Sequence, residues 1–207
     1  MAINPELKLG FLSSHGGSSM RAIVAAIRSG ELPAEARLVV SNNRDCQALA
    51  FAQAEGLAWR HISAVTEGGA EAADAVIADA MQAAGVRLIV LSGYLRKLGP
   101  QTLQRFAGRI LNIHPALLPK HGGQGLYGRR VHEAVKANGD TASGATVHVV
   151  DADYDSGPIV AQREVPVGRE DTAEDIERKV MAIEPGLFVE TLGRIASGQL
   201  SLPDPGP

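Results

Sequence analysis

Short apolar runs alternate with longer amphipathic, alanine-rich stretches along most of the chain. Runs such as "LKLGFLS" and "VRLIVLSG" predict buried strands, and the stretches between them carry the spacing of helices that cover a sheet. The pattern predicts strands at 7–13, 36–42, 86–93 and 108–114, and helices at 19–29, 46–56, 71–85 and just after Pro100. Repeated strand–helix units of this kind favour a mainly parallel sheet.

The pattern changes after the helix expected at 129–139. Two β-branched runs within 143–167 are joined by Asp and Gly residues, which predicts an antiparallel hairpin at the sheet edge. A last helix is expected at about 171–198, with acidic residues in its first turn. We therefore expect an α/β fold with a doubly wound, mostly parallel sheet, a C-terminal antiparallel hairpin and a helix. Residues 1–200 are expected to form one domain and 201–207 a frayed tail.

Composition and charge narrow the class of partner. The chain has 207 residues, 45% of them hydrophobic, and a net charge of −3 from 20 basic and 23 acidic side chains. Since no block of one charge sign occurs, we expect small-molecule substrates and neither nucleic acid nor membrane as a partner. The single cysteine, Cys46, excludes an intrachain disulfide, and no signal-like or membrane-spanning segment is seen, so a cytoplasmic protein is expected. The sequence makes no prediction of oligomeric state.

The first strand is followed by "SSHGGSSMRAI", which is rich in glycine and serine. Backbone N–H groups and the hydroxyls of Ser18 or Ser19 could converge there on an anion at a helix N-terminus. The alternative is a tight turn in which a serine caps the helix. The spacing matches neither a Walker loop nor a dinucleotide-binding fingerprint.

A second strand end reads "SGYLRKLGP". Tyr94, Leu95, Arg96 and Leu98 could line a pocket for a flat heterocycle. An ordinary strand-to-helix junction would have the same composition, so both interpretations stay open.

The third strand end, "ILNIHPALLPKHGGQG", carries the most specific chemistry. Asn112 and His114 alternate with Ile113, so both side chains project from one face of an extended segment. An amide donor beside an imidazole can stabilise developing negative charge on an acyl oxygen while the imidazole exchanges a proton. Pro115 and Pro119 would fix the following loop. The alternative is a pair of hydrogen-bonded residues at a strand end.

The stretch "VVDADYDSGP" could complete such a site. Asp151, Asp153 or Asp155 could orient His114 or a water molecule, although all three could equally be solvated in a surface turn.

Metal catalysis is not favoured. His114, His121, His132 and His148 lie on different predicted elements, and neither HxxxH nor HExxH spacing occurs.

Together these motifs resemble the phosphoribosylglycinamide formyltransferase family over nearly the whole chain. The resemblance depends on "NIHPALLPKHGGQGLYG", "RRVHEAV", "SGATVHVVDADYDSGPIV" and "SGYLRKL", in the order of the family. It implies a Rossmann-like formyltransferase fold and the transfer of a formyl group from 10-formyltetrahydrofolate, the donor co-substrate, to the amine of glycinamide ribonucleotide in purine biosynthesis. No metal is required for that chemistry.

The resemblance also implies roles for single residues. Asn112 would hydrogen-bond the formyl oxygen, His114 would stabilise the oxyanion, and Asp155 would assist proton transfer, with His148 supporting the centre. Further residues would bind the substrates: Gly17, Ser18 and Ser19 the phosphate, Glu184 the ribose, and Tyr94, Leu95, Arg96, Leu98, Val150 and Asp151 the folate.

Two positions depart from the family pattern. Ser19 stands where an asparagine is common, and Pro185 follows Glu184 where a histidine is common. Pro185 is expected to kink the last helix or to mark its boundary.

Other functions remain open at this stage. A formyltetrahydrofolate hydrolase usually has an additional N-terminal domain, and a methionyl-tRNA formyltransferase has a C-terminal domain and a basic surface. A formyltransferase for an amino sugar nucleotide would use the same catalytic residues. A binding paralogue without turnover would not need Asn112, His114 and Asp155 together.

Overall fold

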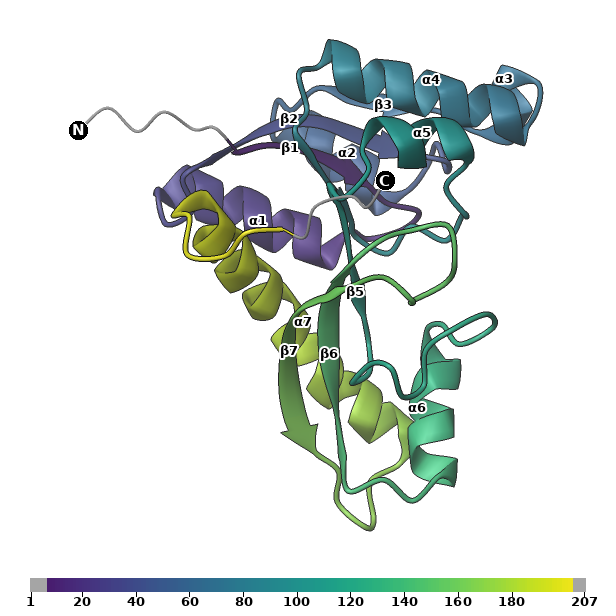
Figure 1. Cartoon of the computed structure of the whole chain (residues 1–207), viewed down its shortest axis with the longest axis vertical. Coiled ribbons are helices and arrows are strands. Elements are labelled where there is room, and N and C mark those ends of the chain that lie inside the picture. The colour runs from purple at the N-terminus through teal and green to yellow at the C-terminus, as the bar shows by residue number, and fades with distance from the viewer. Residues whose placement is uncertain (1–6, 203–207) are drawn as a thin grey trace.

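A seven-stranded sheet forms the centre of the computed structural model, which describes residues 7–202 (Figure 1). Its strand order is β3-β2-β1-β4-β5-β6-β7. The strands are β1 (Leu7–Leu12), β2 (Ala34–Ser41), β3 (Trp59–His61), β4 (Leu88–Leu91), β5 (Ile110–His114), β6 (Ala142–Val149) and β7 (Ile159–Pro166). Strands β1 to β5 pair in parallel, whereas β6 runs antiparallel to β5 and β7 antiparallel to β6. The predicted mostly parallel sheet with a C-terminal antiparallel hairpin is confirmed.

Helices cover both faces of this sheet. They are α1 (Ser18–Ser29), α2 (Gln47–Ala54), α3 (Ala64–Glu67), α4 (Ala70–Ala83), α5 (Pro100–Arg105), α6 (Arg129–Ala137) and α7 (Ala173–Ala196). The sequence did not predict β3 or α3. Strand β3 has only three residues, and its Trp59 is 43% exposed, so it lacks the buried apolar run by which the other strands were found.

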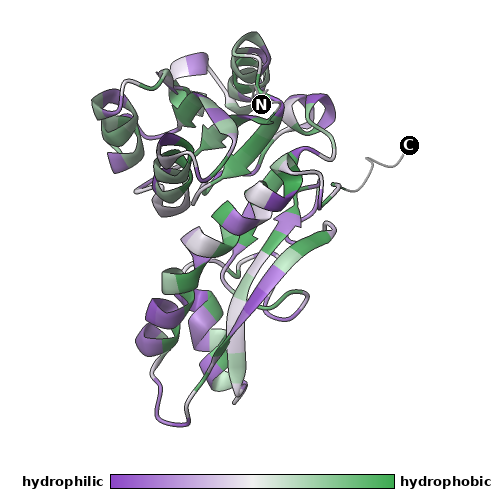
Figure 2. Ribbon diagram, turned by 90° about the vertical axis from the view of Figure 1, so that its left-hand side faces the viewer, coloured by the Kyte–Doolittle hydropathy of each residue, from purple (hydrophilic) through white to green (hydrophobic). Residues whose placement is uncertain are grey.

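The alternation of side chains along the strands explains the double winding. On β1, Leu9 and Phe11 pack into the core shared with α1, α2 and α7, whereas Leu12 packs into the core shared with α4. These core side chains are almost fully buried. In the upper part of Figure 2, mainly hydrophobic strands lie between helices that carry both hydrophobic and hydrophilic residues. Removing both faces from water is the main favourable contribution to this fold.

The strand order changes direction between β1 and β4, since β2 lies on one side of β1 and β4 on the other. In such sheets the crevice at the carboxyl ends of the strands, next to this switch, is where ligands bind. The loops after β1, β4 and β5 therefore carry the residues to inspect first.

Helix α7 follows the hairpin and packs against β6, β7, α1 and α6. Thr172 caps its first turn in a reciprocal arrangement with Asp175. The helix continues through Pro185, so the prediction that this proline could mark a helix boundary is wrong. Contacts with four neighbouring elements hold the helix together although proline cannot donate to the carbonyl of Met181.

No helix among residues 7–202 is long and apolar enough to cross a lipid bilayer. All strands in this range join one sheet, and the domain boundary near residue 200 stays a prediction. Of the predicted tail, residues 203–207 lie outside the described part of the chain.

Candidate active site

Strand β5 ends in Asn112 and His114, and strand β6 places His148 directly opposite Asn112. Asn112 Nδ2 lies 3.1 Å from His148 Nε2. Side chains opposite each other on antiparallel strands are close neighbours, so the register of β5 and β6 creates this contact. His114 is 4% and His148 2% exposed. The predicted common face of Asn112 and His114 is therefore turned toward a buried polar cluster.

Asp155, from the loop after β6, completes this cluster. Its Oδ2 lies 3.4 Å from His114 Nδ1, and its Oδ1 lies 3.5 Å from His148 Nε2. The backbone N–H of Gly123 donates to Asp155 Oδ2 at 3.0 Å. Asp155 has a positive φ of 55°, which turns its side chain toward the two imidazoles. The structure thus joins the two stretches that the sequence singled out.

Hydrogen-bond partners assign the tautomers of the two histidines. The Nδ1–H of His148 donates to the carbonyl of Val149 at 3.1 Å, which leaves Nε2 as the acceptor for the Asn112 amide. The Nε2–H of His114 donates to the carbonyl of His121 at 2.8 Å. In neutral His114, Nδ1 is therefore unprotonated and faces the Asp155 carboxylate.

Burial is the main influence on the charge of both imidazoles. It lowers the pKa of His114 and of His148 below the usual histidine value, and the nearby Asp155 carboxylate opposes the shift. Burial therefore favours the neutral form of both rings. Two acceptors, His114 Nδ1 and Asp155 Oδ2, then face each other and can share one proton or the N–H of a substrate amine.

The other two aspartates of the loop have different surroundings. Asp151 Oδ1 accepts from the N–H of Asp153 at 3.1 Å and from the Ser156 hydroxyl at 2.8 Å, so it stabilises the turn. Asp153 is exposed. The loop returns at Gly157, where an added Cβ would lie 1.9 Å from the Val149 carbonyl oxygen. Only Asp155 is directed at the histidines.

The glycine-rich turn after β1 leads into α1 as predicted. Gly17 is the N-cap residue, with a φ of 64°, and no side chain caps the helix, so the alternative of a serine cap is wrong. Ser18 is exposed, whereas Ser19 is 2% exposed. The Met20 N–H donates to Ser92 Oγ at 3.1 Å. An anion at this helix end would therefore meet the N–H groups of Ser18 and Ser19.

A polar pocket of about 630 Å³ lies beside this turn, at the carboxyl ends of β1, β2 and β3. Arg44, Arg96, His15 and His61 line it together with serine and asparagine side chains. No carboxylate is among the described residues of its lining, so the pocket favours an anionic group. His15, Arg44 and His61 were not predicted from the sequence, although the first two lie in the loops after β1 and β2 and the third ends β3.

The predicted folate residues divide into two groups. Tyr94, Leu98 and Val150 pack into one hydrophobic cluster with the α4 face of the sheet, and burial raises the pKa of Tyr94 to about 12. Leu98 is only 6% exposed, whereas Leu95 is 56% exposed and lines the polar pocket with Arg96. Folate contact by these residues, and by the exposed Asp151, stays a prediction.

The loop that carries these residues is fixed by Asp74 of α4, which the sequence did not reveal. Its buried carboxylate accepts from the backbone N–H groups of Gly99 at 3.1 Å and Gln101 at 2.8 Å, and from Thr102. These are the free donors at the start of α5. Asp74 thus caps α5 from another helix and holds the end of the 94–98 segment.

Glu184 lies in the middle of α7 and is partly buried. Burial alone raises the pKa of its carboxyl to about 7. Hydrogen-bond donors on a bound ligand would stabilise a carboxyl in such surroundings. The ribose role of Glu184 stays a prediction.

No group of three or more His, Cys, Asp or Glu side chains suited to a metal ion occurs in the described range, 7–202. The four histidines considered from the sequence do not come together as one ligand set.

Known proteins resemble this chain in sequence and in fold. The formyl transferase family model matches residues 7–192. The chain is 36% identical over 203 residues to the chloroplastic phosphoribosylglycinamide formyltransferase of Arabidopsis thaliana, covering 96% of this chain and 68% of that protein. It is 36% identical over 197 residues to phosphoribosylglycinamide formyltransferase of Haemophilus influenzae, covering 95% and 91%.

A solved structure agrees with these matches. The crystal structure of glycinamide ribonucleotide transformylase 1 from Symbiobacterium toebii superposes with a TM-score of 0.89 at 34% identity, covering 98% of this chain and 93% of that one. The family predicted from the Asn-x-His-Pro string and the aspartate-rich turn is thereby confirmed. The chain belongs to the formyl transferase family.

Proposed function

We propose that this protein transfers a formyl group from 10-formyltetrahydrofolate to the amine of glycinamide ribonucleotide, a step of purine biosynthesis. The observation that carries the proposal is the cluster of the partly buried Asn112 and Asp155 with the buried His114 and His148. Relatives with 36% identity over most of the chain are named for this activity.

The cluster suits an acyl transfer. The amine nitrogen attacks the formyl carbon, a C–N bond forms, and the formyl oxygen becomes an oxyanion. Asn112 still has a free amide hydrogen beyond the one directed at His148, and this can donate to the oxyanion. Such donors in a buried site stabilise the transition state because water does not compete with them.

The proton of the attacking amine needs an acceptor. His114 Nδ1 and Asp155 Oδ2, 3.4 Å apart, together form a place where this proton can reside. Once protonated, His114 is an imidazolium beside the oxyanion and favours it electrostatically. The bond from the formyl carbon to N10 then breaks, and the proton passes to N10, so that tetrahydrofolate and the formylated ribonucleotide leave as products.

The two substrates would be held on opposite sides of this cluster. The phosphate would meet the N–H groups of Ser18 and Ser19, where the neighbouring basic pocket adds positive charge. Glu184 would accept from ribose hydroxyls. Tyr94 and Val150 would border the folate ring, because both lie at the edge of one apolar cluster.

The proposal is tested by measuring whether tetrahydrofolate release depends on the formyl acceptor. Purified protein is incubated with 10-formyltetrahydrofolate and either glycinamide ribonucleotide, an amino sugar nucleotide or no acceptor, and released tetrahydrofolate and formylated product are measured. We expect release only with glycinamide ribonucleotide. Release without an acceptor would instead identify a hydrolase, formylation of the sugar nucleotide would identify a different acceptor, and binding without turnover would indicate a paralogue that has lost catalysis.

A further inference from the structure

Residues 121–123, which connect β5 to α6, contact both proposed catalytic side chains. The carbonyl of His121 accepts from His114 Nε2 at 2.8 Å, and the N–H of Gly123 donates to Asp155 Oδ2 at 3.0 Å. An added Cβ at Gly122 would lie 3.2 Å from the Cβ of Asp155, so the segment also packs against that side chain. The conformation of this segment therefore determines where both groups point.

His121 adopts a backbone conformation that its own residue type disfavours. Its φ is 56°, in the left-handed region, where a non-glycine residue is strained. Such a conformation persists only where other contacts impose it. The contact that imposes this conformation is made by the imidazole of His121, whose Nε2 lies 2.5 Å from Asp140 Oδ2. The side chain of His121 is 12% exposed and that of Asp140 13%.

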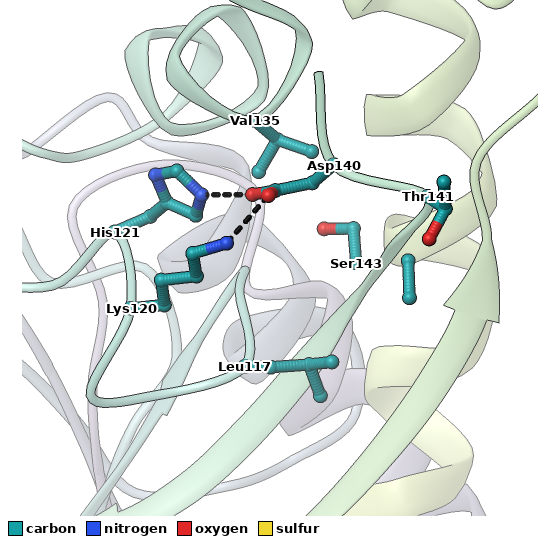
Figure 3. Close-up of a pocket in the computed structure, with 8 residues that line it drawn as sticks. Leu117, Lys120, His121, Val135, Asp140, Thr141 and Ser143 are labelled. Carbon is teal, nitrogen blue, oxygen red and sulfur yellow. Dashed lines mark hydrogen bonds and ion pairs between the residues drawn. The ribbon is translucent and has the colours of Figure 1, made fainter. Parts of the chain in front are cut away.

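Asp140 lies between α6 and β6, and its carboxylate is a permanent acceptor. Lys120 Nζ lies 2.5 Å from the second oxygen, Oδ1. The hydrogen bonds from Lys120 and His121 lower the pKa of Asp140 to about 2, so its carboxyl is ionised at neutral pH. Figure 3 shows Lys120 and His121 converging on Asp140 at the edge of a cavity.

We propose that Asp140, acting through His121, is a positioning residue that holds the His121 carbonyl as the acceptor for the Nε2–H of His114. This arrangement fixes the tautomer of His114, and with it the direction of the unprotonated Nδ1 toward Asp155. The inference deepens the proposed formyl transfer, since it assigns to Asp140 the orientation of the group that accepts the amine proton. Partners of this kind typically alter activity about 10–100-fold where they orient metal-ligating histidines, and a similar range is expected here.

Histidine-selective ¹⁵N NMR measures the tautomer directly and does not depend on turnover. In the wild type we expect a neutral His114 protonated at Nε2, assigned by comparison with His114→Gln. In Asp140→Ala this resonance should change to a mixture of tautomers. Lys120→Ala is the matched control, because Lys120 contacts the same carboxylate but neither catalytic side chain, and its His114 signal should be that of the wild type.

The cavity beside Asp140 has a volume of about 240 Å³, so a shortened side chain enlarges an existing space and leaves packed core residues in place. If Asp140→Ala nevertheless fails to fold, Asp140→Asn retains one acceptor oxygen, and we expect a smaller change of the same tautomer signal. An Asp140→Ala or Asp140→Asn spectrum in which His114 keeps the wild-type tautomer would overturn the proposal.

Steady-state kinetics give an independent readout. Asp140→Ala should lower kcat about 10–100-fold with each KM within about threefold of the wild type, because positioning of a proton acceptor affects the chemical step. His121→Gly should retain more activity than His121→Ala, since glycine adopts a φ near 56° without strain. Unchanged kcat, or a loss confined to KM, would contradict the assignment. Absence of formyl transfer by the wild type would refute the proposed function and leave the NMR result to decide this inference.

Discussion

Replacing Glu184 by glutamine should stabilise the protein at alkaline pH. Burial raises the pKa of the folded carboxyl from 4.5 to about 7. Between these values the unfolded chain has released the proton while the folded chain still holds it, so the free energy of unfolding falls as pH rises. A shift of this size corresponds to about 3 kcal/mol. Glutamine has nearly the same shape as glutamate but no proton to release. The free energy of unfolding of the variant should therefore not fall through this position as the pH rises.

The sign follows from the direction of the shift. Glu184 contributes fully to the free energy of unfolding below pH 4.5. This contribution decreases as the pH rises and has been lost once the pH exceeds about 7. We therefore expect Glu184→Gln and the wild type to have nearly equal free energies of unfolding at pH 4.5. At pH 8 the variant should be more stable by up to about 3 kcal/mol.

Urea unfolding of both proteins at pH 5 and pH 8 measures this difference. Glu190→Gln is the control on the same helix, because Glu190 is exposed and pairs with Arg163 at the surface, where such pairs contribute little. If Glu184→Gln gains no stability over the wild type between pH 5 and pH 8, the carboxyl is not desolvated in the folded protein and the argument is wrong.

The remaining predictions concern the cluster and its supports. His114→Ala should lower kcat by about 10²–10⁴-fold, and Asp155→Asn should do so comparably with little change in Tm; a large fall in Tm would make Asp155 a structural turn residue instead. His148→Ala removes the acceptor of the Asn112 amide and should lower kcat about tenfold at nearly unchanged KM, measured by steady-state kinetics; a loss confined to KM would disprove it. Asp74→Ala should cost about 1–3 kcal/mol of stability in urea and raise the KM for the folate, because three backbone N–H groups lose their acceptor; an unchanged KM would separate this cap from folate binding.

Much of the architecture follows from local pattern. The apolar runs of β1, β2, β4 and β5 are strong signals, because strands buried on both faces need continuous apolar sequence. Strands β6 and β7 were found from their β-branched residues and from the turn residues between them. Asn112 and His114 were found for a related reason, since polar side chains at the end of such a strand must have a partner or a function. The strands and site residues that could be predicted from the sequence are those whose signal lies within one continuous segment.

The parts that the sequence did not reveal depend on contacts between distant segments. Asp140 reaches His121 across the whole of α6, and Asp74 caps a helix other than its own. Neither pairing has a fixed spacing along the chain. The serine cap was wrongly offered as an alternative for a similar reason, because the left-handed conformation of Gly17 turns the chain into α1 without a side-chain cap.

The most direct test of the account follows the formyl group itself. A single turnover with ¹³C-formyl tetrahydrofolate and glycinamide ribonucleotide is monitored by NMR for the wild type and for Asp155→Asn. We expect the label to move into an amide of the ribonucleotide, one for each tetrahydrofolate released, and to do so at least about 100-fold more slowly in the variant. Label recovered as formate, or transfer at the wild-type rate in a folded Asp155→Asn protein, would contradict the proposed formyl transfer by this cluster.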